Sequence, residues 1–248
     1  MTKFAIAVVG GMMLVTSPVG AQDSTQIIFG IYYRCNQAQE SSADAAVHNT
    51  LGPIVQRHVD AGHLTGWLWL AHNQGGAWRR IFVTTGTDLG QMMTVRQQIV
   101  DEFTGQHATV ANDLATACPG HDDYIWTSVS TSGLPNPDVL GAATISAYHA
   151  CDRSREGRAD EIFEQVLAPL YQKHVDMGHI ATWGYYAHRI GGVFRRLETF
   201  SGADHATLLS MQGAIYQEAG DTNPLAMREF NEICNWHSDY LWTNATQP

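Results

Sequence analysis

Histidine is the residue type with chemical potential that this sequence uses most freely, with twelve in 248 residues. Four of them return 116 positions later in the chain (174 − 58 = 116), which gives the pairs His58/His174, His63/His179, His72/His188 and His121/His237. Imidazole can act as a general acid or base, as a metal ligand and as an axial haem ligand. The recurrence shows that these positions matter to a local structure, but it does not separate packing from function.

Two of the four histidine pairs lie on predicted helices or strands that could face a cavity. His58 and His174 fall near the C-terminal ends of amphipathic helical segments, where they could point between helix and sheet or be hydrogen-bonded core histidines. His72 and His188 end apolar strand segments and could line a cavity or cap a strand in solvent. We expect His63, His179, His121 and His237 to lie in turns or at strand starts with local hydrogen bonds.

Other polar and aromatic side chains could complete a site. Tyr32 and Tyr148 are hydroxyl donors on the first predicted strand of each copy, so the candidate ligand-binding set is His58, His174, His72, His188, Tyr32 and Tyr148. Adjacent arginines (Arg79-Arg80 and Arg195-Arg196) could hold a carboxylate or phosphate, or could pair with acidic neighbours at the sheet rim. The dense strand aromatics are typical of a core and could also line an apolar pocket.

Recognised catalytic and metal patterns are missing from the sequence. The spacing from His58 through His63 to His72 matches no zinc pattern and no CxxC pair occurs, so no metal site is predicted. No nucleophile elbow, phosphate loop or dinucleotide fingerprint is present either. No cofactor is predicted, although haem stays open as an alternative because a single axial histidine can hold it.

The elements that must position these side chains are used twice. The offset of 116 also carries Pro53 to Pro169 and Trp67 to Trp183, so the two copies should share one fold. In the first copy the periodicity predicts a strand at Ile27 to Cys35 and a helix from Ala43 to near Gly62. A hairpin of Leu64 to His72 and Trp78 to Thr85 follows, then a helix capped by Asp88, a shorter helical piece and a last strand at Tyr124 to Val129.

This order of strand, helix, strand, strand, helix, strand resembles the ferredoxin-like fold. Its tandem use resembles the dimeric α+β barrel superfamily, in which two such sheets face each other. The resemblance covers both copies and implies an α+β protein whose two ferredoxin-like units form an intramolecular barrel, so that the monomer contains an internal pseudo-dimer. It also implies a pocket between helix and sheet or inside the barrel, and activities such as those of cofactor-independent monooxygenases and isomerases.

Cysteine usage and the N-terminus both predict export. Lys3 precedes an apolar run from Phe4 to Val15 that is too short to span a bilayer, and small residues end at Ala21. We expect a signal peptide at 1–21, units at 22–129 and 142–248, and a linker at 130–141, in a periplasmic or secreted protein. The pairing that keeps each copy self-contained is Cys35 with Cys118 and Cys151 with Cys234.

Composition narrows the possible partners. The formal net charge is −10 without a clustered basic patch, which argues against nucleic acid, and no apolar run after the signal argues for a membrane partner. The first functional hypothesis is a protein that binds a small apolar or aromatic molecule inside the barrel. The alternatives are a cofactor-independent monooxygenase or isomerase with these histidines as acid or base, and a non-catalytic structural or interaction module of the cell envelope.

Overall fold

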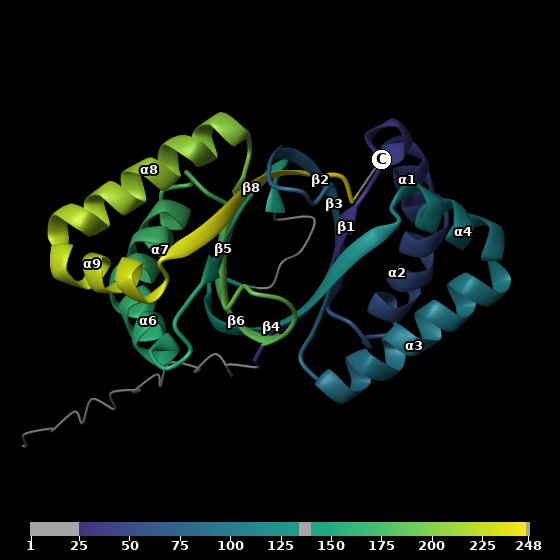
Figure 1. The fold of residues 1–248 in the computed structure, drawn as a ribbon, viewed down its shortest axis with the longest axis horizontal. Helices are drawn as coiled ribbons and strands as arrows, with labels where there is room; N and C mark the ends of the chain where they lie inside the picture. The colour runs from purple at the N-terminus through teal and green to yellow at the C-terminus, as the bar shows by residue number, and fades with distance from the viewer. Residues whose placement is uncertain (1–24, 134–139, 247–248) are drawn as a thin grey trace, which may run out of the picture.

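A closed antiparallel β-barrel with helices on two opposite sides organises the molecule (Figure 1). The computed structural model describes residues 25–133 and 140–246, so the predicted signal peptide lies outside the described residues. The strands of the described part are β1 (Ile27–Arg34), β2 (Gly66–Gly75), β3 (Arg80–Gly86), β4 (Gly120–Thr131), β5 (Ala143–Ala150), β6 (Thr182–Ile190), β7 (Arg196–Gly202) and β8 (Trp236–Asn244). The prediction of an α+β barrel is confirmed.

The helices lie outside the barrel, those of the N-terminal half on one side and those of the C-terminal half on the other (Figure 1). The N-terminal half (residues 25–133) has η1 (Gln37–Gln39), α1 (Glu40–Ala46), the π-helix η2 (Val47–Leu51), α2 (Gly52–Asp60), α3 (Leu89–Gln106) and α4 (Ala108–Ala117). The C-terminal half (residues 140–246) has α6 (Glu156–Ile162), the π-helix η3 (Phe163–Leu167), α7 (Ala168–Asp176), α8 (His205–Thr222) and α9 (Pro224–Ile233).

The two halves close the barrel by pairing with each other. The strand order around the barrel is β1-β3-β2-β8-β5-β7-β6-β4, so the seams are β2 with β8 and β4 with β6. At these seams Leu70 pairs with Asn244, and Thr127 pairs with Ala187. Closure leaves no unpaired sheet edge among the described strands, which removes the usual route to edge-to-edge association.

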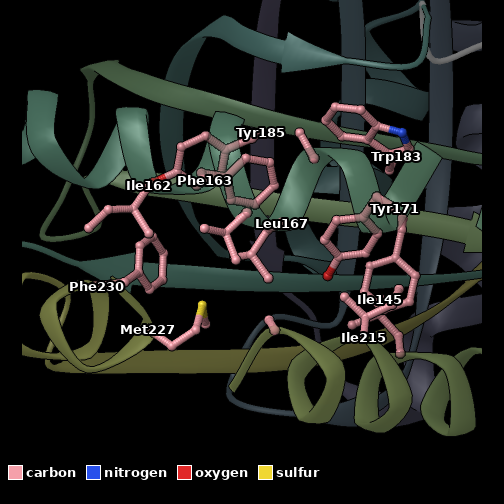
Figure 2. Close-up of a cluster of buried hydrophobic side chains, with 14 of the residues drawn as sticks. Ile145, Ile162, Phe163, Leu167, Tyr171, Trp183, Tyr185, Ile215, Met227 and Phe230 are labelled. Atoms are coloured by element: carbon pink, nitrogen blue, oxygen red, sulfur yellow. The ribbon is translucent and has the colours of Figure 1, made fainter. Parts of the chain in front are cut away.

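Alternation along the strands creates two different kinds of core. In β1, Ile27 and Phe29 face the helices, whereas Ile28 and Tyr32 face the barrel interior. Each sheet is therefore apolar on both faces, as expected for a sheet covered on both sides. Figure 2 shows the helix-side core of the C-terminal half, where Phe163 stacks on Tyr185 with ring centroids 3.8 Å apart.

Local signals in the sequence set several element boundaries. Asp88 caps α3 by accepting a hydrogen bond from the backbone N–H of Gln91 at 2.8 Å. Gly62 has φ +74°, the left-handed conformation that ends a helix most readily at glycine. The predicted helix from Ala43 to Gly62 is divided into α1, η2 and α2, because Pro53 has no N–H to donate and begins a new first turn after the π-helix.

Two disulfides join the ends of strand pairs, and the predicted pairing is confirmed. Cys35 bonds Cys118 and Cys151 bonds Cys234, each across a sequence separation of 83 residues. A bridge closing a loop of this size stabilises the fold by about 4 kcal/mol in the chain-entropy model. Such bridges persist in oxidising compartments.

The end of strand β4 differs from the sequence-based expectation. Strand β4 continues to Thr131, because it pairs with β6 as far as Gly184, so the predicted linker at 130–141 begins too early. Residues 134–139 of that linker lie outside the described part. Within the described residues no helix combines the length and apolar character needed to cross a membrane.

Candidate functional site

The barrel interior, where we expected a ligand pocket, is filled by side chains. Its core consists largely of aromatic and aliphatic residues that are almost fully buried, among them Trp78, Trp126, Phe194, Tyr240 and Trp242. A cavity of about 60 Å³ remains between the two sheets. Because one water occupies roughly 30 Å³ of liquid volume, this space suits a few waters and excludes a ring-sized ligand.

Tyr32 and Tyr148 belong to this packed interior. Their rings meet edge to face with centroids 5.5 Å apart, and the Tyr32 hydroxyl accepts a hydrogen bond from Trp126 Nε1 at 3.0 Å. Burial raises the pKa of both phenols above the ordinary value of 10, so both stay protonated. These tyrosines therefore serve packing, and they do not line a cavity large enough for an organic molecule.

His72 and His188 each contact two rings of the aromatic interior edge to face. Arg79 Nη1 donates to His72 Nδ1 at 2.6 Å, and Arg195 Nη1 donates to His188 Nδ1 at 2.5 Å. Burial and then the neighbouring guanidinium lower the pKa of each imidazole, so the neutral form is favoured. The Nε2 of each is buried without a hydrogen-bond partner among the described residues.

The paired arginines are bound by carboxylates of the first helix in each half. Arg79 Nε donates to Glu40 Oε1 at 2.6 Å, and Arg80 Nε donates to Asp44 Oδ1 at 2.7 Å. The C-terminal half repeats these pairs with Glu156 and Asp160. This matches the structural alternative, in which the arginines pair with acidic neighbours and hold α1 or α6 to its sheet.

His58 and His174 lie at the ends of α2 and α7 and form local pairs. His58 Nδ1 is 3.3 Å from His63 Nδ1, and His174 Nδ1 is 2.9 Å from His179 Nδ1. Partial burial and then the second imidazole lower the pKa of His58 and of His174. Neither residue lines the cavities described below, and the six candidate residues are not brought together at one point.

An apolar cavity lies outside the barrel, between the sheet and α3 of the N-terminal half. It has a volume of about 120 Å³ and is lined mainly by aliphatic and aromatic side chains of the sheet and α3, among them Phe29, Phe82, Met92, Val95, Ile99 and Phe103. For comparison, an apolar cavity of about 150 Å³ accommodates benzene in another protein. The space is therefore sized for a single small ring or a short alkyl chain.

Three polar residues line this cavity, namely Tyr33, Thr84 and Arg96. Arg96, on α3, lines it and also donates from Nη2 to Asp123 Oδ2 at 3.3 Å. Tyr33 lines it from β1, and burial followed by the nearby Asp123 carboxylate raises the pKa of its phenol. A guanidinium and a protonated phenol can orient a polar substituent of a bound molecule, but neither is a base at neutral pH.

The corresponding space in the C-terminal half holds a buried carboxylate that sequence reasoning missed. Glu198 is 1% exposed, accepts a hydrogen bond from the Tyr216 hydroxyl at 2.6 Å and accepts another from the Tyr171 hydroxyl. His149 Nε2 lies 3.5 Å from Glu198 Oε2. Burial opposes ionisation of Glu198, but His149 and the two hydroxyls outweigh it and lower the pKa of this carboxyl.

A signal for this cluster was present in the sequence. At the offset of 116, Phe82 corresponds to Glu198, Val55 to Tyr171 and Val100 to Tyr216. Three apolar positions of one copy thus change together to hydrogen-bonding residues in the other. Comparing the copies position by position for differences, and not only for shared residues, would have found it.

The apolar cavity of the N-terminal half does not fit a haem. An axial ligand needs an imidazole nitrogen that is free to bind iron beside an apolar slot. Histidine is not among the residues that line the apolar cavity of the N-terminal half. Beside a more polar pocket of the C-terminal half, His237 has a 53% exposed side chain with Nδ1 engaged by Asp239 at 2.9 Å.

The fold of the chain is similar to that of several solved structures. A suspected monooxygenase of Fusobacterium nucleatum matches with a TM-score of 0.58 at 8% identity over 89% of this chain and 93% of that protein. An anthrone oxidase-like protein matches with 0.53 at 8% identity, over 90% and 92%. A mutant chlorite dismutase of Candidatus Nitrospira defluvii matches with 0.51 at 10% identity, over 91% and 92%.

These likenesses concern the fold alone, because the sequence identities are so low. Neither a protein-family model nor a curated protein sequence matches the chain.

Proposed function

We propose that this protein is an exported monomer made of two fused ferredoxin-like units and that it binds a small apolar or aromatic molecule. The binding place is the cavity between α3 and the sheet of the N-terminal half, in place of the barrel interior considered from the sequence. The single observation that carries the proposal is a cavity of about 120 Å³ with an almost wholly apolar lining. An apolar pocket with a few placed polar groups is the usual form of a small-molecule site.

The polar groups define the ligand further. Arginine offers five N–H donors in a planar fork, and Arg96 stands beside a cavity whose other polar lining residues are Tyr33 and Thr84. A ring or alkyl chain of the ligand would lie against Met92 and Val95, with a hydroxyl or carboxylate toward Arg96. The hydrogen bond from Arg96 Nη2 to Asp123 Oδ2, 3.3 Å long, orients the guanidinium of Arg96.

A cofactor-independent monooxygenase is the second candidate, favoured by the names of the fold neighbours with TM-scores above 0.5. Such a reaction needs a base that removes a proton from the substrate. Of the described residues that line the apolar cavity, Tyr33 and Arg96 are the titratable ones, and neither accepts a proton at neutral pH. Binding is therefore better supported than catalysis at this cavity.

Titration calorimetry with toluene and benzoate tests the proposal. Val100→Tyr introduces the residue that stands at the equivalent position of the C-terminal half and should fill the cavity, since Val100 lines it. We expect saturable binding to the wild-type protein and its loss in Val100→Tyr. Met93→Tyr, on the same helix at a 51% exposed position, is the matched control and should bind as the wild type does. Absence of binding of both probes, or equal binding by Val100→Tyr, would refute the proposal.

A further inference from the structure

A second pocket lies in the C-terminal half, between strands β5 and β8 and helices α8 and α9. Its volume is about 410 Å³, and the residues that decide its character are Ala147, His149, Gln212, Tyr216, His237 and Asp239. The sheet pairs His149 with His237 and Ala147 with Asp239, so these four side chains come from one small area of its helix-facing surface. Ala147 leaves room there, because the equivalent position of the N-terminal half holds the larger Ile31.

One carboxylate lines the pocket and a second lies behind its wall. Asp239 Oδ1 is 2.9 Å from His237 Nδ1, while its Oδ2 has no hydrogen-bond donor within residues 25–133 and 140–246. The ionised Glu198 lies directly behind Tyr216 and His149. Arg196, the nearby cation on β7, is held by Asp160 at 2.6 Å and is therefore already neutralised.

The equivalent carboxylate of the N-terminal half, Asp123, has an arginine beside it. There His121 and Asp123 form the same pair at 2.9 Å, but Arg96 also donates to Asp123. At the position equivalent to Arg96 the C-terminal half has Gln212. The guanidinium of Arg96 thus binds Asp123, whereas Asp239 faces a pocket in which no arginine stands at the equivalent position.

His149 is the independent sign that a partner is missing. It is 4% exposed and lines the pocket; its Nε2 lies 3.5 Å from Glu198 Oε2, whereas its Nδ1 has no hydrogen-bond partner in the described part of the chain. Leaving a buried polar group unsatisfied costs about 1–3 kcal/mol. A bound molecule with N–H donors would remove this cost while neutralising Asp239.

We propose that this pocket binds a small organic ammonium ion. Its N–H groups donate to Asp239 Oδ2 and to the acceptor nitrogen of His149, and its alkyl part lies against Ala147 and Phe230. The Tyr216 and Phe230 rings that border the pocket favour a cation over a neutral ligand. This site is separate from the apolar cavity of the N-terminal half and takes a ligand of different charge.

Titration of the full protein with butylammonium, followed by the imidazole NMR signals, tests this inference. We expect saturable shifts of the His149 and His237 signals and none with butyrate, which has the same chain length and the opposite charge. Asp239→Asn should weaken butylammonium binding by about tenfold or more, as expected for losing one charge-assisted hydrogen bond. Asp123→Asn is the matched control, because it changes the same histidine–aspartate pair in the other half, and it should leave the affinity unchanged.

Ala147→Ile provides a second variant that uses the residue found at position 31. It should abolish butylammonium binding while toluene binding in the N-terminal half persists, which also shows that the variant is folded. The inference is overturned if butylammonium causes no saturable shift at His149 and His237. It is equally overturned if Asp239→Asn and Asp123→Asn bind the ion alike, or if butyrate binds as well as butylammonium.

Discussion

The two helix-side spaces of this molecule occupy equivalent places in the two halves and have opposite chemistry. In the N-terminal half, Phe82 and its neighbours line an apolar cavity of about 120 Å³. In the C-terminal half, the same place holds the buried carboxylate Glu198 with hydroxyl donors from Tyr171 and Tyr216. The backbone elements repeat at an offset of 116 residues, so the difference lies in side chains. The two halves therefore share the order of their backbone elements and differ in the side chains of their interiors.

The difference also shows how a buried charge is tolerated. Taking a carboxylate out of water costs several kcal/mol unless hydrogen bonds and an opposite charge compensate it. Glu198 has both hydroxyls and the nearby His149, whereas Phe82 is surrounded by apolar side chains. The residues of this cluster should therefore depend on one another. Adding the carboxylate alone to the N-terminal half, or removing one of its partners in the C-terminal half, should lower the free energy of unfolding.

The largest loss of stability is expected when a carboxylate is placed in the apolar cavity of the N-terminal half. Phe82→Glu places an uncompensated carboxylate in the apolar cavity and should lower the free energy of unfolding by about 3–5 kcal/mol. Adding Val55→Tyr and Val100→Tyr supplies the two hydroxyls of the other half and should restore at least about 1 kcal/mol. Urea denaturation followed by circular dichroism measures both. A triple variant no more stable than Phe82→Glu alone would show that the hydroxyls do not compensate the charge.

Removal of one disulfide should have the next largest effect, and the same effect in each half. Cys35→Ala with Cys118→Ala, or Cys151→Ala with Cys234→Ala, should lower the free energy of unfolding by about 2–4 kcal/mol, because both bridges close loops of equal length. Chemical denaturation of the two double variants provides the comparison. A large loss from one pair and none from the other would contradict the equivalence of the halves as scaffolds.

A smaller effect is expected from loss of one hydroxyl at the carboxylate. Tyr216→Phe removes the donor that lies 2.6 Å from Glu198 Oε2 and should destabilise the protein by about 1–3 kcal/mol. It should also raise the pKa of Glu198, since the ionised form loses a hydrogen bond. Denaturation at neutral pH and the pH dependence of stability report these two changes. The matched control Tyr33→Phe, on a strand of the other half, should have the smaller effect.

The smallest effect concerns histidines that both halves share. The pKa values of His58, His72, His174 and His188 lie below the ordinary value of 6.5 in the folded protein. Between 6.5 and these lowered values the unfolded chain binds more protons, so stability is full above pH 6.5 and declines as the pH falls through this window. Melting temperatures from pH 7.5 down to 5 should show the decline, and His72→Gln with His188→Gln should reduce it. Stability that increases on acidification across this window would contradict these shifts.

Much of the fold follows from local sequence signals. Periodicity predicted the strand β1, and Asp88 and Gly62 marked the start and end of helices. The disulfide pairing followed from the repeat and is confirmed. These features depend on periodicity and on single residue types, which a sequence displays directly.

The sequence left two places open for a pocket, between helix and sheet or inside the barrel, because cavity volume depends on how side chains from distant strands meet. Tyr32 points inward as a strand residue should, but its hydroxyl is used by Trp126, 94 positions away in the chain. Contacts of this kind between side chains of distant strands fill the interior of the barrel. Glu198 was missed for a related reason, since an acidic residue in a strand is ordinary until the partners Tyr171 and Tyr216 arrive from two helices.

Methyl NMR of the protein titrated with toluene tests the central claim most directly. The account predicts shifts at Met92, Val95 and Ile99, which line the cavity of the N-terminal half, and none at Leu70 or Val83, which face the barrel interior. Shifts at the barrel methyls without shifts on α3, or equal shifts at the equivalent α8 residues Leu208, Met211 and Ile215, would contradict it.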